Sequence, residues 1–180
     1  VIRDWSSDVC SSDLEARGIC RTFDSASLHI DTGATAGEFK AELKRSDGFI
    51  HIATHASRSS ENPLFSKIML ADGPFFPFDL FATGIRAELV ALSGCQTAAS
   101  GLYYGHSFSL AKAFYQAGSR FVLASLWPVS DKASEEFMRR FYRHLRKSND
   151  VPGAYRGAVA ATSETAGSPA FWGAFVLLGV

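Results

Sequence analysis

Hydrophobic and polar residues follow one another along this chain with the two periods that strands and helices require. Four short apolar runs bounded by turn residues predict buried strands at 48–55, 87–94, 120–127 and 172–180. Apolar residues spaced three or four apart predict helices at 36–45, 106–118, 130–147 and 152–165. A hairpin strand is expected at 67–71, with a turn at 72–74. This alternation predicts an α/β/α sandwich with a mostly parallel central sheet.

The ends of the predicted helices carry residues that suit helix termini. Thr35 can cap the helix at 36–45, and Ser130 or Asp131 can cap the helix at 130–147. That second helix has acidic residues in its first turns and basic residues at its end, as the helix dipole favours. Gly118 is a natural stop for the helix at 106–118.

The first fourteen residues differ from the rest of the chain. They repeat the tripeptide SSD and show no periodicity, and residues 4–14 back-translate to a sequence that resembles a common short-read sequencing adapter. We therefore interpret residues 1–14 as a non-native, adapter-derived segment, the alternative being a natural disordered terminus. We expect residues 15–180 to form one domain of a longer protein, and deletion of residues 1–14 to leave the melting temperature unchanged.

Composition excludes several classes of function. The chain has 180 residues, of which 47% are hydrophobic, and 18 basic residues balance 18 acidic ones. Because the charges balance, the sequence does not predict nucleic-acid binding by bulk charge. Because the apolar runs are too short to cross a bilayer, it does not predict a membrane span. No GxGxxG follows a predicted strand, which argues against a Rossmann-type nucleotide binder. Cys20 and Cys95 lack metal-ligand spacing, so we expect no metal, no organic cofactor and a reducing cytoplasmic location.

Two predicted strands end in residues that could carry chemistry. The run "HIATHA" ends near His55, and "ELVALSGC" ends at Cys95. Reactive residues gather beyond the carboxyl ends of parallel strands, so neighbouring strands would bring His55 and Cys95 together as a nucleophile pair. Gly94 would leave room for a substrate backbone. Alternatively, Cys95 is a small buried residue at a strand end, which is the commoner role of a free cysteine.

Other candidate residues have structural explanations of similar weight. His51 could line the cleft, although a satisfied, partly buried histidine is the simpler interpretation. His106 is expected at a helix start, where it could approach the site, although a surface role is the simpler interpretation. Gln96 and Thr97 are expected to shape the turn after Cys95.

Four blocks in this order resemble the CHAT domain family: "HIATHA", "ELVALSGCQTA", "GSRFVLASLWPVSD" and "FWGAFVLLG". This resemblance covers roughly residues 19–180. It implies a caspase-like α/β/α sandwich, distantly similar to separase, that is usually attached to tetratricopeptide repeats in bacterial proteins. It also implies that His55 and Cys95 are the catalytic pair, and that the backbone N–H groups of Ala56 and Cys95 form the oxyanion hole. Ala56 stands where many relatives have glycine.

The resemblance also draws attention to the loop that ends at Asp131. The loop "LWPVSD" is similar to a separase segment whose acidic residues relate to a preference for basic side chains. Asp131 could therefore contact substrate, and a role as helix N-cap is an equally good interpretation. Pro128 replaces the first acid of that segment, so the substrate preference stays open.

Two functions follow from the sequence. One is a cysteine endopeptidase that cleaves a protein or peptide substrate and is gated by a repeat region upstream in the parent chain or by a partner. The other is a catalytically silent peptide-binding or scaffold module of the same fold.

Overall fold

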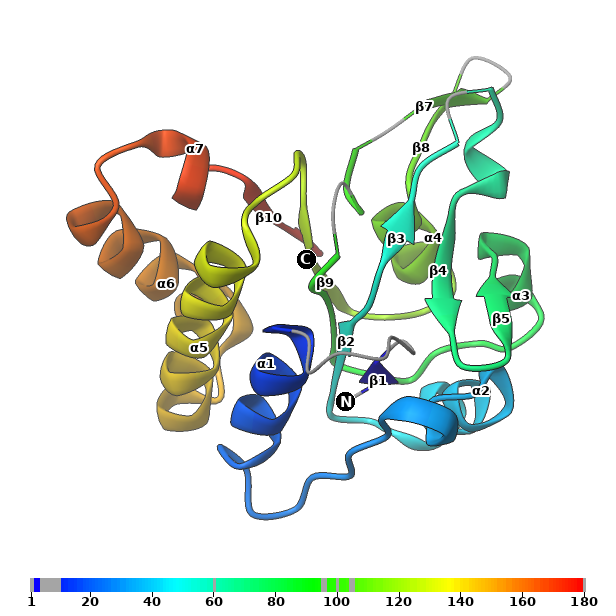
Figure 1. The fold of residues 1–180 in the computed structure, drawn as a ribbon, viewed down its shortest axis with the longest axis horizontal. Coiled ribbons are helices and arrows are strands. Elements are labelled where there is room, and N and C mark those ends of the chain that lie inside the picture. Colours follow the sequence, from blue (N-terminus) through cyan, green and yellow to red (C-terminus); the bar gives the residue numbers. More distant parts are fainter. Residues whose placement is uncertain are drawn as a thin grey trace.

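Five strands form the central sheet of the computed structural model, which describes residues 2–3, 11–59, 61–94, 97–99, 101–103 and 106–179 (Figure 1). Their order across the sheet is β1 (Ile2–Arg3), β2 (Phe49–Ala53), β6 (Leu89–Leu92), β9 (Phe121–Ser125) and β10 (Phe175–Gly179). The first four strands are parallel, and β10 is antiparallel to β9. The expected mostly parallel sheet is confirmed.

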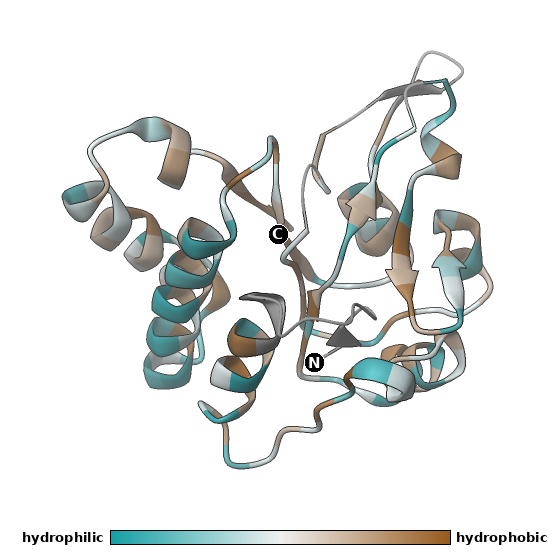
Figure 2. Ribbon diagram, in the orientation of Figure 1, coloured by the Kyte–Doolittle hydropathy of each residue, from teal (hydrophilic) through white to brown (hydrophobic). Residues whose placement is uncertain are grey.

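Helices cover both faces of this sheet, as the sequence predicts. One face packs against α1 (Ser11–Cys20), α5 (Asp131–Ser148) and α6 (Val151–Thr165), and the other packs against α2 (Ala36–Arg45), α3 (Pro77–Phe81) and α4 (Leu110–Gln116) (Figure 1). Alternate residues of β6 enter the two layers, because side chains along a strand point to opposite faces. Figure 2 shows the result as hydrophobic strands between helices that carry hydrophilic residues, most clearly along α5.

Small antiparallel units extend from the sheet. One contains β3 (Ala56–Ser57), β4 (Lys67–Leu70) and β5 (Gly73–Phe75), and another contains β7 (Gly101–Tyr103) and β8 (His106–Phe108). The remaining elements are the 3₁₀ turns η1 (Asp31–Gly33) and η2 (Pro63–Phe65) and the short helix α7 (Pro169–Trp172). The helix predicted at 106–118 is therefore wrong in its first part: residues 106–108 form a strand, and α4 begins only after the Ser109 cap.

Helices α2 and α5 begin directly after residues whose side chains cap them. The Thr35 hydroxyl accepts a hydrogen bond from the Glu38 N–H, which confirms the expected cap of α2. Ser130 caps α5 by accepting from the Ala133 N–H, so Asp131 is the first helical residue rather than the cap. Asn149 ends α5 in the left-handed conformation, which asparagine tolerates better than most residues.

Helix α1 was not expected from the sequence pattern. It begins at Ser11, so the boundary that we place after residue 14 falls inside a helix. Its Ala16 and Ile19 side chains are buried. The non-native origin of residues 1–14 stays a prediction. Among the described residues, no helix is long and apolar enough to cross a membrane.

Candidate active site

The candidate site lies at the edge of the sheet where β2, β6 and β9 end. Strands β2 and β6 are parallel neighbours with Ile52 opposite Leu92, and the Ser93 N–H donates a 2.8 Å hydrogen bond to the Ile52 carbonyl. The segments that follow the two strands therefore leave the sheet side by side. This confirms that the strands ending before His55 and before Cys95 are neighbours.

Gly94 lies in close contact with the segment that follows β2. A Cβ atom at this position would lie 2.8 Å from the Thr54 carbonyl oxygen and 3.2 Å from the Ala56 Cβ. Any larger residue would push the two strand ends apart. The sequence suggested that Gly94 leaves room for a substrate; instead, Thr54 and Ala56 occupy the space beside its Cα.

Hydroxyl groups from β9 and from the turn after β6 hold this edge in place. The Ser125 hydroxyl donates a 2.9 Å hydrogen bond to the Gly94 carbonyl, and the Ser125 N–H donates to the hydroxyl of buried Thr97 at 3.3 Å. The Ala98 N–H in turn donates to the Ser125 carbonyl at 2.8 Å. Thr97 thus shapes the turn as expected, whereas Gln96 lies outside the described residues.

His55 is exposed at this edge, and its backbone is held by the neighbouring hairpin. Its carbonyl accepts a 3.0 Å hydrogen bond from the Met69 N–H, and the Thr54 hydroxyl donates to the Met69 carbonyl at 2.6 Å. Half-buried Ala56 follows in β3, opposite Ile68 of β4. The backbone around His55 is therefore fixed by the main sheet on one side and by β4 on the other.

Cys95 lies outside the described residues, so its distance from His55 and its part in an oxyanion hole stay predictions. Of the predicted site residues, the structure describes His55 and Ala56 together at the strand ends, and Asp131 at the start of α5. The start of α5 approaches the same edge, because the hydroxyls of Ser93 and Ser134 share a 3.0 Å hydrogen bond. No motif in the sequence pointed to Ser134.

His51 is a buried structural residue and lies apart from this edge. It is 2% exposed, its Nε2 lies 3.0 Å from the Glu15 carboxylate, and its Nδ1 lies 3.2 Å from the Tyr142 hydroxyl. Burial, reinforced by the Glu15 charge, raises the pKa of Tyr142, which stays a neutral hydrogen-bonding group. Among the described residues, His51 Nε2 and the facing Glu15 Oε1 lack hydrogen-bond geometry, so the expected satisfied histidine is borne out only at Nδ1, where Tyr142 is the partner. His106 lies in β8 rather than at a helix start.

The part of the chain that the structure describes contains no cluster of three His, Cys, Asp or Glu side chains arranged to hold a metal ion. The chemistry available at the sheet edge is that of an exposed imidazole, backbone N–H groups and several hydroxyls.

Comparison with a solved structure defines the class of fold. The Arg-specific cysteine proteinase gingipain R superposes on 97% of this chain and 42% of its own, with a TM-score of 0.64 at 11% sequence identity. The protein therefore has a caspase-like α/β fold.

Sequence comparison defines the family. The profile of the CHAT domain matches residues 6–180, and this chain belongs to the CHAT domain family. Tetratricopeptide repeat protein 28 of Homo sapiens and that of Mus musculus are each 32% identical to it over 103 residues. That match covers 56% of this chain but only 4% of either relative.

Proposed function

We propose that this domain is a cysteine endopeptidase that uses Cys95 as nucleophile and His55 as acid and base. The observation that carries the proposal is the packing of the two strand ends. Gly94, the residue before Cys95, touches Thr54 and Ala56, the residues on either side of His55. Consecutive Cα atoms are about 3.8 Å apart, so this contact favours a short distance between the two reactive groups. Membership of the CHAT family and the caspase-like fold support the same assignment.

The proposed reaction has two steps. The Cys95 thiol transfers its proton to His55, and the sulfur attacks the carbonyl carbon of the scissile peptide. The carbonyl oxygen becomes an oxyanion, which the backbone N–H groups of Cys95 and Ala56 would stabilise. His55 protonates the leaving amine, and the sulfur remains bound to the acyl group. His55 then takes a proton from water, and the hydroxide attacks the thioester carbonyl. The carbon–sulfur bond breaks, the carboxylic acid product leaves, and His55 returns the proton to the released thiolate.

Another residue at this edge would contact the substrate, and a region outside this domain would control the activity. The exposed position of Asp131 at the start of α5 is compatible with contact to a basic substrate side chain. The relatives are repeat proteins in which this region is a small part, which supports gating of the site by a repeat region of the parent chain.

A thiol-reactive peptide probe tests the assignment of the nucleophile. The wild-type chain should be labelled, Cys95→Ala should not, and His55→Ala should react slowly because the thiol loses its base. Cys20→Ala is the matched control, since Cys20 is a free cysteine among the described residues, lies at the end of α1, and should not affect labelling. Labelling that persists in Cys95→Ala would place the nucleophile elsewhere. A domain that neither labels nor cleaves, with its repeat region attached, would be the silent binding module.

A further inference from the structure

A groove of about 620 Å³ runs between α1 and α5, and the described residues of the candidate site do not line it. The side formed by α1 and the turn after it is lined by Leu14, Glu15, Gly18, Ile19 and Thr22. On the α5 side the groove is lined by one acidic residue and by four basic ones: Glu135, Arg139, Arg143, Arg146 and Lys147. The groove therefore combines a partly apolar wall with a strongly cationic one.

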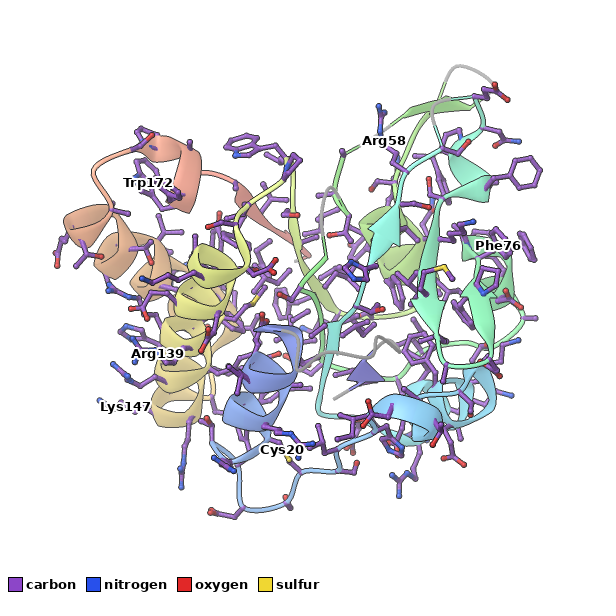
Figure 3. The ribbon with its side chains drawn as sticks, viewed as in Figure 1. Cys20, Arg58, Phe76, Arg139, Lys147 and Trp172 are labelled. Atoms are coloured by element: carbon purple, nitrogen blue, oxygen red, sulfur yellow. The ribbon has the colours of Figure 1, made fainter. Side chains whose placement is uncertain are left out.

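The four basic side chains form a continuous stripe along α5, which we call the α5 basic stripe (Arg139, Arg143, Arg146 and Lys147). Their spacing of three and four residues puts them on one side of the helix, over about 12 Å of its length. Figure 3 labels Arg139 and Lys147, near the two ends of the stripe. Arg143 and Lys147 are exposed, and none of the described residues forms an ion pair with either.

Acidic partners offset only part of the positive charge of the stripe: Arg139 pairs with Glu136, and Arg146 lies 3.5 Å from Asp24. Arg139, Arg143 and Lys147 follow one another at four-residue intervals, where like charges repel. The helix dipole favours cations in the last turn and explains Arg146 and Lys147, and the Glu136 carboxylate accounts for Arg139, but neither accounts for Arg143. The chain as a whole is neutral, so the stripe is a local concentration of positive charge rather than part of a general excess.

We propose that the groove binds an acidic amphipathic helix of a protein partner. Its apolar side would lie against Gly18 and the aliphatic parts of the arginine side chains, and its carboxylates would face Arg143 and Lys147. Space is available, because among the described residues no heavy atom beyond the surrounding backbone of α1 and the two chain neighbours lies within 4 Å of the position that a Gly18 Cβ would occupy. Two adjacent helices with a groove between them are a common seat for a third helix. The proposal is independent of the peptidase assignment.

Nucleic acid fits the groove less well than an acidic helix. Single-stranded nucleic acids bind where aromatic rings stack on bases, and the described lining residues include no aromatic side chain. Glu135 would also repel a backbone that carries a charge at every nucleotide, whereas a helix can place its carboxylates only where cations face them.

Fluorescence anisotropy with a labelled model peptide tests the proposal. The probe is a short peptide with leucines along one helical face and glutamates elsewhere, and the comparison peptide has the same composition in scrambled order. The amphipathic peptide should bind, and the scrambled one should bind about tenfold more weakly, because only the former pairs leucines with the groove. Binding should also weaken as salt is raised.

Two variants of this chain make the test specific. Arg143→Glu with Lys147→Glu should weaken binding by about tenfold or more, because two attractions become repulsions. Lys44→Glu with Arg86→Glu is the matched control, since both residues are exposed outside the groove and carry the same charge. Gly18→Leu should also weaken binding, because its side chain would fill the groove while leucine is a better helix former than glycine. Circular dichroism checks that each variant is folded.

Three results would overturn the proposal. The first is equal binding of the amphipathic and scrambled peptides. The second is equal loss in the stripe variant and in the Lys44/Arg86 control. The third is preferential binding of a single-stranded RNA of matched charge, which would make the stripe a nucleic-acid surface.

Discussion

At the scale of single residues, buried hydroxyl groups maintain the edge of the sheet beside His55. The hydroxyl of Thr97 accepts from the Ser125 N–H and lies 3.4 Å from the Gly94 carbonyl, to which it donates. Thr97 itself is 1% exposed, so these backbone groups have little access to water as a substitute partner. The position of the turn after β6 thus depends on one small side chain.

Thr97→Val should therefore destabilise the fold by about 1–3 kcal/mol, because valine keeps the shape of threonine but leaves the Ser125 N–H unpaired. Urea unfolding followed by circular dichroism measures this loss. Thr165→Val is the control: its hydroxyl bonds only to carbonyls of its own helix at the surface, so the change should stay within about 0.5 kcal/mol. Equal losses of unfolding free energy in the two variants would show that the Thr97 hydrogen bonds stabilise the fold no more than those of exposed Thr165.

Two buried phenols make stability depend on alkaline pH. Burial raises the pKa of Tyr142 and of Tyr155 above the ordinary value near 10. The folded state therefore keeps these protons at pH values where the unfolded chain has released them. Their contribution to the free energy of unfolding is complete below about pH 10 and falls as the pH rises above it.

Between pH 9 and pH 11, the free energy of unfolding of Tyr142→Phe should fall less steeply with pH than that of the wild type. The slope from one phenol approaches about 1.4 kcal/mol per pH unit once the unfolded chain is deprotonated. Urea titrations at several pH values give both slopes. Parallel curves for the two proteins would contradict the assignment. Tyr155→Phe should show a smaller change, because Tyr155 is less buried.

His51, in β2, and His55, just after β2, show which properties of a single residue could be predicted from the sequence. The position of His55 at a strand end followed from a local apolar run, and the structure has it there. The partners of His51, which are Glu15 and Tyr142, come from distant parts of the chain. Local patterns contain no information on such contacts, so only the burial of His51 could be anticipated.

At the scale of elements, the turn between α4 and β9 contains a glycine whose backbone conformation and surroundings disfavour any side chain. Gly118 has a φ of +122°, and a Cβ there would lie 2.5 Å from the Ile85 carbonyl oxygen. The neighbouring Ala117 carbonyl accepts from the Ile85 N–H at 2.8 Å, so the two segments cannot separate easily. Gly118 thus both ends α4 and admits a second chain segment.

Gly118→Ala should lower the free energy of unfolding by about 1–3 kcal/mol, because it combines an unfavourable φ with a steric clash. Gly33→Ala is the control, since a Cβ at Gly33 would meet no described residue within 4 Å, and the change should alter stability by less than about 0.5 kcal/mol. Thermal and urea unfolding of both variants provide the comparison. A Gly118→Ala protein as stable as Gly33→Ala would show that the turn adjusts freely.

Most elements could be predicted because their periodicity is local, and the exceptions have physical reasons. Residues 106–108 were assigned to a helix because a short segment of mixed polarity fits either period, and pairing with β7 decides for a strand. The antiparallel direction of β10 could not be predicted, since an apolar run indicates burial and not direction. Helix α1 was missed because its first residues belong to the segment interpreted as non-native.

At the scale of the whole molecule, two hydrophobic layers share one sheet. Phe39 of α2 belongs to the layer on one face, and Phe137 of α5 belongs to the layer on the other, where it stacks on Phe175 at 4.0 Å between ring centroids. Both layers include residues of β6 and β9. Loss of either layer therefore exposes one face of the same strands, which favours unfolding in a single cooperative step.

Phe39→Ala and Phe137→Ala should each destabilise the domain by about 3–5 kcal/mol. Tryptophan fluorescence and circular dichroism should report the same unfolding midpoint for each variant. Phe39→Ala is the more demanding case, because Trp127 and Trp172, two of the three tryptophans, lie near α7 rather than in the layer that contains Phe39. Trp5, which lies outside the described residues, is replaced by phenylalanine so that the fluorescence comes from these two. Two separate midpoints in this variant would show that the layers unfold independently.

The division between core and edge has a consequence for how such domains change over evolutionary time. The segments that follow β2 and β9 carry exposed residues: Ser57, Arg58 and Glu61 after β2, and Leu126, Trp127 and Ser130 after β9. Substitutions at exposed positions change folding stability little, whereas those in the layers beneath are costly. Related proteins can therefore differ at these exposed loop residues, and so in the molecules that they bind, while selection for a stable fold preserves the strands beneath.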